Sequence, residues 1–191
     1  MELTDIQKDI LMEVGNIGIG HAATALSKML DGTVNIELPK LQVTNIDGII
    51  NAYPTEGYLT NCGIVGEIGG DLAFVLSKKE LLRVVELMTK APKNSVKEID
   101  EMGKSAIAEV MNILSGAYLT SLSDFSGFNL MPNIPDFKDM PLKDALSSIV
   151  KDGKEILEIK TSFNILEESL YAHMYLILET SDMIKILDKV K

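Results

Sequence analysis

The sequence has little of what metal sites and phosphate clamps are usually built from. Its 191 residues include one cysteine, two histidines and, among 18 basic residues, a single arginine, Arg83. Cys62 alone cannot form an internal disulfide, and His21 and His173 stand at no metal-ligand spacing from it or from each other. We therefore expect no bound metal or cofactor, no bidentate arginine clamp for phosphoryl groups, and a reduced, cytoplasmic location.

Positive charge and long apolar runs are also scarce. The net charge is -10, which opposes binding to nucleic acid or to anionic membranes, because both need clustered positive charge. No apolar run of about 18 residues is present, and the N-terminal MELTDIQKDI lacks the order of a signal peptide. We expect neither nucleic-acid binding nor membrane insertion, while 46% apolar residues suffice for a core.

The hydrophobic pattern predicts helices and hairpins in blocks. Residues 5 to 30 are predicted to be helical, with an apolar stripe of Ile6, Ile10, Val14 and Ile17. Strand-like runs follow at TVNIELP and KLQVTNI, then a hairpin at GYLTNCGIVGEI and GDLAFVLS, and a helix at KKELLRVVELMTK. The order then restarts, with a helix near 98 to 122, strand-like material near 127 to 134, strands at KEILEIKTSFNI and LYAHMYLILE, and a helix at SDMIKILDKV.

The second half of the chain repeats the first. EVGNIGIGHAATALS at 13 to 27 and EVMNILSGAYLTSLS at 109 to 123 share eight of fifteen residues at an offset of 96, whereas the helices that close the halves align at 102. We assign the six additional residues to an added short helix at PLKDALSSIVKDG. The sequence thus predicts one α+β domain over residues 1–191, built from two repeats, about 1–92 and 93–191, around a pseudo-twofold axis.

Polar residues, and not only apolar ones, are preserved in the repeated helix. Each copy carries a polar or small residue at steps of four, three and four, which places the set on one helix face. The sets are Asp9, Glu13, Asn16 and Gly20 in the first copy and Ser105, Glu109, Asn112 and Gly116 in the second. Packing of a duplicated core requires only that the apolar positions are kept, so exposed polar residues can differ between the two copies without loss of stability. A single Glu-Asn pair is typical of an ordinary solvent-exposed helix face, but two such pairs at equivalent positions of a repeat predict a function.

The glycines of GNIGIG suggest a phosphate-binding loop only weakly. Their order differs from G-x-G-x-x-G, no strand precedes them, and the second copy has Met111 and Leu114 in place of Gly15 and Gly18. A nucleotide-binding enzyme that uses this segment is therefore a weakly supported hypothesis. It predicts a nucleotide-dependent rise in melting temperature.

The chemistry open to an exposed Glu-Asn pair is narrow. Asparagine has no proton to exchange near neutral pH, so its amide can act only by hydrogen bonding. Held against a phosphorylated carboxylate, it could orient a water in line with the phosphorus, and a hundredfold acceleration needs only about 2.7 kcal/mol. The glutamate suits contact with a partner's lysine better than general-base catalysis, because an exposed helix turn offers little burial to raise its pKa.

The same residues carry a family resemblance. The pattern is [Asp/Ser]-x3-Glu-x2-Asn followed by 22 residues and a proline, which is Pro39 after Asn16 and Pro135 after Asn112. The chain resembles the CheC, CheX and FliY group of bacterial chemotaxis phosphatases, which dephosphorylate the response regulator CheY. Two motifs favour the CheC branch over CheX, which carries one and works as a dimer. Because the sequence ends at residue 191, we expect no flagellar-switch domain like that of FliY.

The resemblance implies a sheet with two equivalent long motif helices exposed on one surface and a phosphatase site at each Glu-Asn pair. Asn16 and Asn112 would enter the regulator's active site and position water, while Glu13 and Glu109 would contact its lysine. The supporting residues would be Asp9 and Ser105, which cap or orient the glutamates, and Pro39 and Pro135, which shape strand starts.

The partners that the resemblance implies are a phosphorylated CheY-like response regulator, which carries the Mg2+, and the deamidase CheD, whose binding raises phosphatase activity. We expect the chain itself to be a monomer. The alternative is a non-catalytic adaptor that binds CheD or a flagellar component.

Overall fold

The computed structural model describes residues 4–36, 40–53, 56–150, 154–165 and 168–189. One series of helices and strands is followed by a second in the same order. The first is α1 (Asp5–Leu30), β1 (Val34–Ile36), β2 (Lys40–Thr44), α2 (Ile46–Ala52), β3 (Gly57–Gly66), β4 (Gly70–Ser77) and α3 (Lys78–Thr89). The second is α4 (Glu101–Ser126), β5 (Leu130–Pro132), β6 (Asp136–Lys138), α5 (Leu142–Ile149), β7 (Lys154–Ile165), β8 (Glu168–Glu179) and α6 (Thr180–Lys189). The fold is α+β, as predicted.

The described strands form one antiparallel sheet. Its order is β1-β7-β8-β4-β3-β5, with β2 also paired to β7 and β6 also paired to β3. This order is symmetric about the β4–β8 pair, and each series places its two short strands beside the hairpin of the other. Such an arrangement fits two repeats related by a pseudo-twofold axis. The duplication itself remains a prediction.

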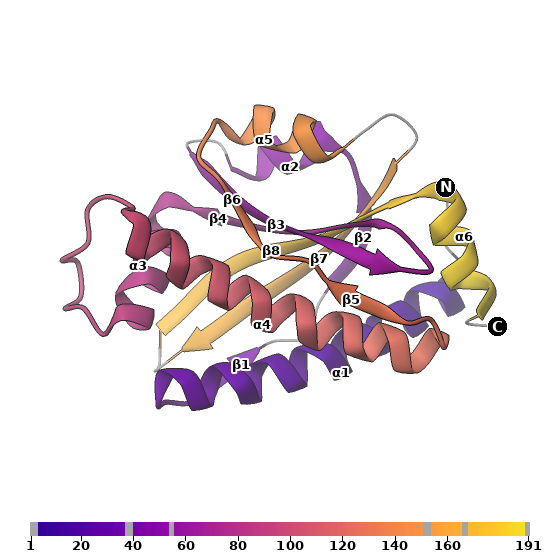
Figure 1. Cartoon of the computed structure of the whole chain (residues 1–191), viewed down its shortest axis with the longest axis horizontal. Helices are drawn as coiled ribbons and strands as arrows, with labels where there is room; N and C mark the ends of the chain where they lie inside the picture. Colours follow the sequence, from indigo (N-terminus) through magenta and orange to yellow (C-terminus); the bar gives the residue numbers. More distant parts are fainter. Residues whose placement is uncertain (1–3, 37–39, 54–55, 151–153, 166–167, 190–191) are drawn as a thin grey trace.

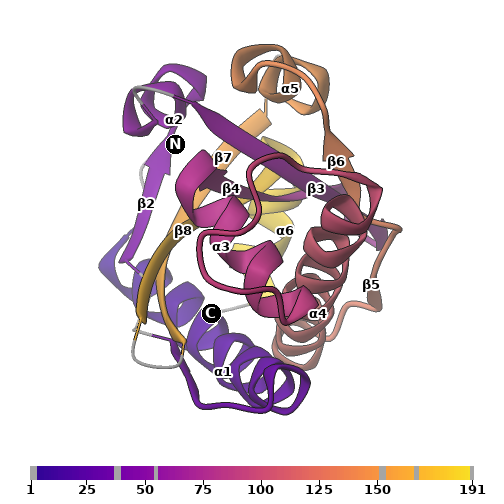
Figure 2. The ribbon, with the colours of Figure 1, turned by 90° about the vertical axis from the view of Figure 1, so that its left-hand side faces the viewer.

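Helices cover both faces of the sheet (Figures 1 and 2). Helices α1, α3, α4 and α6 pack on one face, and the shorter α2 and α5 pack on the other. Strand β8 contributes side chains to the cores on both faces, because successive side chains of a strand point to opposite faces. Leu176 and Leu178 belong to the first core, and Tyr175 and Ile177 to the second. The sheet is therefore buried on both sides.

Helix α1 buries a different face from the one that the apolar pattern predicts. Ile6 is 72% exposed and Ile17 45% exposed, so of the expected stripe only Val14 is fully buried. The expectation was wrong because the buried stripe contains small residues, which a count of large apolar side chains ignores. The buried residues are Leu11, Val14, Gly15, Gly18, Ile19, Ala22 and Leu26.

The two long helices α1 and α4 lie side by side and run in opposite directions (Figure 1). A Cβ atom on Gly18 would lie 2.9 Å from the Cα atom of Tyr118 and 3.2 Å from the carbonyl oxygen of Ala117. Both atoms belong to backbone, so no side chain fits at Gly18 without separating the helices. The segment GNIGIG is thus the interior of a helix and forms no loop around a phosphate.

The short helix expected at PLKDALSSIVKDG is present as α5, but it is not an addition to the second half. Helix α2 begins at Ile46, 96 positions before α5 begins at Leu142, so the two are counterparts. Most of the additional residues lie in the hairpin, where β7 and β8 have 12 residues each while β3 has 10 and β4 has 8. Helix α2 was not predicted because it is short and contains Gly48, and glycine is a weak helix former.

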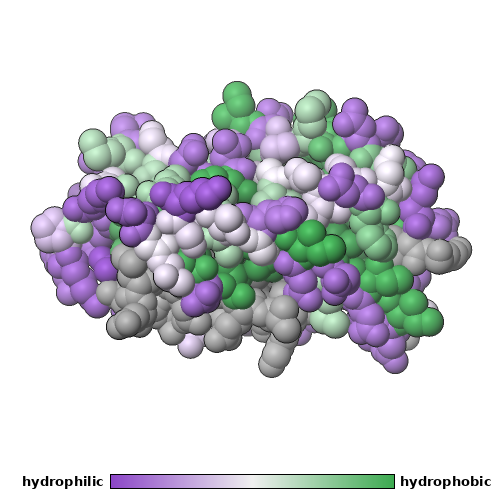
Figure 3. Space-filling view, turned by 90° about the horizontal axis from the view of Figure 1, so that it is seen from below, coloured by the Kyte–Doolittle hydropathy of each residue, from purple (hydrophilic) through white to green (hydrophobic). Residues whose placement is uncertain are grey.

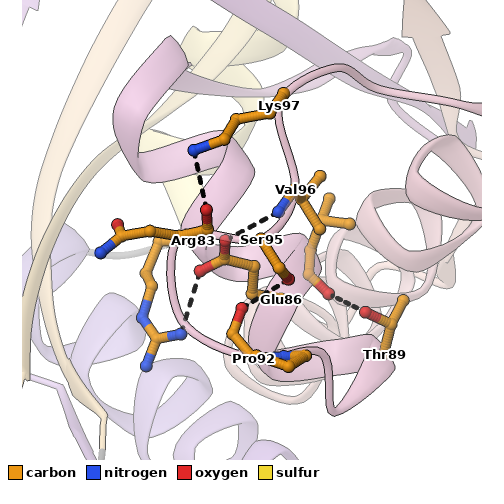
Figure 4. Close-up of polar contacts among 9 residues, drawn as sticks. Arg83, Glu86, Thr89, Pro92, Ser95, Val96 and Lys97 are labelled. Atoms are coloured by element: carbon orange, nitrogen blue, oxygen red, sulfur yellow. Dashed lines mark hydrogen bonds and ion pairs between the residues drawn. The ribbon is translucent and has the colours of Figure 1, made fainter.

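A buried carboxylate holds the connection from α3 to α4 (Figure 4). The Oε1 atom of Glu86 accepts the backbone N–H of Val96 at 3.1 Å, and its Oε2 atom accepts a guanidinium N–H of Arg83, also at 3.1 Å. The Glu86 side chain is only 3% exposed. This connection fixes the position from which α4, and with it the second motif, begins.

We expect Glu86→Gln to destabilise the protein more at pH 7 than in acid. Burial opposes the charge of Glu86, yet the backbone N–H groups of Asn94 and Val96 and the Arg83 guanidinium together hold the pKa of its carboxyl below the ordinary 4.5. The carboxylate therefore stabilises the folded state above about pH 4.5, and this contribution is lost as the pH falls through the lower, folded-state pKa.

Urea unfolding of wild type and Glu86→Gln at pH 7 and at pH 3.5 measures this contribution. The expected difference at pH 7 is about 2 kcal/mol, the range for hydrogen bonds to a charged group, and it shrinks at pH 3.5. A difference of the same size at both pH values would contradict the assignment to the ionised carboxylate.

Candidate functional site

The motif residues lie on the side of each long helix that faces away from its buried stripe. Glu13, Glu109 and Asn112 are exposed, and Asn16 is half-buried. An α-helix turns by about 100° per residue, so Leu11 and Ala22, which are buried, lie roughly opposite Glu13. Figure 3 shows the side on which α1 lies in Figure 1, where polar and hydrophobic residues are interspersed. Both Glu-Asn pairs are therefore displayed on the helical side of the molecule.

The glycine that follows each asparagine by one turn leaves open space above the helix. A Cβ atom built on Gly20 or on Gly116 would meet no atom within 4 Å. These glycines thus differ from Gly18, which the packing of α1 on α4 requires. A glycine on an exposed helix face costs about 1 kcal/mol relative to alanine, and no contact within the described part of the chain compensates for that cost.

The two asparagines differ in their surroundings. The side-chain oxygen of Asn16 is buried and has no hydrogen-bond partner among the described residues, whereas Asn112 is an exposed residue. The backbone carbonyl of Asn112 accepts the hydroxyl of Ser115 at 3.2 Å, while the residue at the position of Ser115 in α1 is the apolar Ile19. The sequence gives no hint of the difference in exposure, because it depends on what packs beside each helix.

Asp9 and Ser105 are exposed residues inside their helices, not helix caps. The N-caps are Thr4, which forms a capping box with Gln7, and Asp100, which accepts the N–H of Gly103. The Ser105 hydroxyl donates to the carbonyl oxygen of Glu101 at 2.9 Å, one turn earlier. A role of Asp9 and Ser105 in orienting the glutamates remains a prediction.

Pro135 is a half-buried residue directly before β6, which begins at Asp136. This is the place at a strand start that the sequence predicts. Pro39 lies outside the described residues, and β2 begins at Lys40.

The motif faces offer mostly carboxylates and amides, and the exposed Lys8 on α1 is paired with Asp5 at 3.4 Å. Among the residues that line them, from Ile6 to Thr24 on α1 and from Met102 to Thr120 on α4, the exposed charged groups include Glu13 and Glu109. Such a face can hydrogen-bond and attract a cation, so it fits a partner that carries its own positive charge. Within the described part of the chain, no three histidine, cysteine or acidic residues lie close enough to share a metal ion. None of the described helices is both long and apolar enough to cross a bilayer.

Two apolar residues on these faces were not predicted to be exposed. Ile6 is 72% exposed and Met102 is 66% exposed, and they occupy equivalent positions, 96 apart. The apolar pattern had placed Ile6 in the buried stripe. The offset of 96, applied to apolar as well as polar residues, could have identified the pair.

Comparison with known proteins supports the motif. A family model described as the CheC-like family matches residues 6–41 and 102–138, the two segments that contain the motifs. The CheY-P phosphatase CheC of Bacillus subtilis (strain 168) is 27% identical over 184 residues, which cover 90% of this chain and 87% of that protein.

Solved structures agree with the fold. The X-ray crystal structure of Thermotoga maritima FliY matches with a TM-score of 0.81 and 23% identity, covering 100% of this chain and 98% of the other. A chain in the crystal structure of the CheX-CheY-BeF3-Mg+2 complex from Borrelia burgdorferi matches with a TM-score of 0.55 and 19% identity over 86% of this chain and 97% of that one. The family model and the Bacillus relative show that the chain is similar to the CheC-like family in both motif segments, and the solved structures show a shared fold.

Proposed function

We propose that this chain is a chemotaxis phosphatase that hydrolyses the aspartyl phosphate of a CheY-like response regulator. One observation carries the proposal: a Glu-Asn pair stands on the outward side of two helices, at equivalent positions 96 residues apart. The name of the Bacillus subtilis relative, CheY-P phosphatase, supports it. So does the structure of a CheX-CheY complex in a match that shares the fold.

Each asparagine positions the attacking water. Its amide oxygen accepts a hydrogen bond from the water, which turns a lone pair of the water toward the phosphorus, in line with the bond to the aspartate. As the water oxygen bonds to phosphorus, the phosphorus–oxygen bond to the aspartate breaks and the aspartate leaves as a carboxylate. The proton of the water passes to the phosphate or to solvent. Asparagine is neither protonated nor consumed in this step.

The glutamates and the partner supply the remaining interactions. Glu13 and Glu109 pair with a lysine in the site of the regulator, which fixes how deeply each asparagine enters. The Mg2+ that neutralises phosphoryl charge belongs to the regulator. Arg83, the one arginine of the sequence, is bound to the buried Glu86 on α3 and is not part of either motif. Activation by CheD, a monomeric state and a cytoplasmic location complete the proposal.

Decay of a phosphorylated receiver domain tests the function directly. The receiver is phosphorylated with a small phosphodonor, the donor is removed, and the phosphorylated fraction is followed with and without this protein. A shortened lifetime that depends on protein concentration supports the phosphatase. An unchanged lifetime would instead favour the alternative, an adaptor that binds CheD or a flagellar component without catalysis.

We expect the two sites to contribute unequally, with the α4 site the faster. Asn112 is exposed, whereas the amide oxygen of Asn16 is covered and must be uncovered before it can accept a water. That oxygen has no hydrogen bond to lose, so the cost is modest, and a threefold difference in rate corresponds to about 0.7 kcal/mol. Asn112→Ala should therefore remove well over half of the activity and Asn16→Ala well under half. Equal losses in the receiver assay would contradict this ranking.

A further inference from the structure

Each motif helix displays one large apolar side chain at the start of its polar face. Ile6 on α1 is 72% exposed and Met102 on α4 is 66% exposed. Each stands three residues before the first motif residue, Asp9 or Ser105, and the two are 96 positions apart, as the motifs are. The repeat therefore includes an exposed apolar position as well as the polar ones.

Helix geometry places this apolar residue on the same face as the glutamate. Residues seven apart on an α-helix differ by only about 20° around the axis and by about 10 Å along it. Ile6 is seven residues before Glu13, and Met102 is seven residues before Glu109. Each face thus runs from an apolar contact, through the carboxylate, to the asparagine.

Isolated exposed apolar residues are ordinary and need no explanation. Met131 and Val43 are of that kind, since they are 57% and 42% exposed but their counterparts at the offset of 96 are the polar Asn35 and Asp139. Ile6 and Met102 differ because both members of the pair are apolar and both are exposed. Neither contributes to the core, so the folding of the protein does not explain why both positions are apolar.

We propose that Ile6 and Met102 are apolar anchors for the response regulator, one for each site. The inference rests on the proposed phosphatase function and assigns catalysis and affinity to different residues of each face. The asparagine acts on the phosphoryl group, and the anchor contributes affinity by burying its side chain against an apolar patch of the receiver, roughly 10 Å or more from the phosphorylated aspartate. The occupant is thus the receiver domain itself, held in register with the polar motif on the same helix.

Single-site backgrounds test the anchors one at a time. In a chain carrying Asn112→Ala, only the α1 site remains, so Ile6→Gln should raise KM for the phosphorylated receiver about tenfold, with kcat within twofold of its parent. Met102→Gln should change neither constant in that chain. In a chain carrying Asn16→Ala the two expectations exchange, and Met102→Gln alone should raise KM.

The control is Ile134→Gln, the same kind of change at a residue that is 85% exposed and lies between β5 and β6, outside both motif helices. It should leave KM unchanged in both backgrounds. An unchanged KM for Ile6→Gln and Met102→Gln overturns the proposal. So does a substitution that raises KM equally in both single-site backgrounds, or one that lowers only kcat. If the parent chains do not shorten the receiver's phosphate lifetime at all, the phosphatase function itself fails, and that outcome is distinct from any of these.

Discussion

Replacing Asn16 and Asn112 together by alanine is expected to reduce stimulated dephosphorylation of the receiver about a hundredfold or more. Each substitution removes the amide that holds the water in line, and positioning worth about 2.7 kcal/mol corresponds to that factor. The rate constant for decay of the phosphorylated receiver, measured at saturating protein, gives the result. Because neither side chain has a protonation role, the loss should be in kcat and nearly independent of pH between 6 and 8.

Folding should survive the double substitution. Asn112 is exposed, and Asn16 contributes a buried oxygen without a partner, so its removal leaves no donor or acceptor newly unpaired. Circular dichroism and urea unfolding serve as checks. Glu13→Gln with Glu109→Gln provides the matched comparison, since loss of a contact to the partner's lysine should act mainly on KM. A double asparagine variant that stays folded and retains the wild-type rate would refute the proposed mechanism.

The order of helices and strands was largely predictable because each depends on local patterns. The capping box at Ser77 and Glu80 marks the start of α3, and alternating β-branched residues mark β1 and β2. The three-residue strand β6 was missed because a segment that short carries no period. The exchange of short strands between the two series was not predictable either, because strand partners far apart in the chain leave no local pattern.

The helix face that carries the candidate site was predictable, but the exposure of its individual side chains was not. The offset of 96 and the steps of four, three and four fix which helix face the motif occupies, and that face is the outward one. Whether an individual side chain is covered depends on neighbours from other parts of the chain. The difference between Asn16 and Asn112, and the exposure of Ile6 against the predicted stripe, therefore required the structure.

The same substitution at two glycines two residues apart should change stability in opposite directions. Gly18→Ala places a Cβ atom 2.9 Å from the Cα atom of Tyr118, and backbone cannot move aside as a flexible side chain can. The helices α1 and α4 must separate, which costs about 2 kcal/mol, the middle of the range for overpacking. Gly20→Ala meets no atom within 4 Å and should stabilise α1 by up to about 1 kcal/mol through helix propensity.

Urea unfolding of the two variants beside wild type separates these effects, with an expected gap of about 3 kcal/mol between them. Gly18→Leu, which copies Leu114 of the second motif into the first, should destabilise the chain further, because the larger side chain widens the separation. Gly18→Ala should also disturb both phosphatase sites, since both depend on how the two helices lie together. Changes of the same sign in Gly18→Ala and Gly20→Ala would show that helix propensity, and not the contact with Tyr118, decides the stability at position 18.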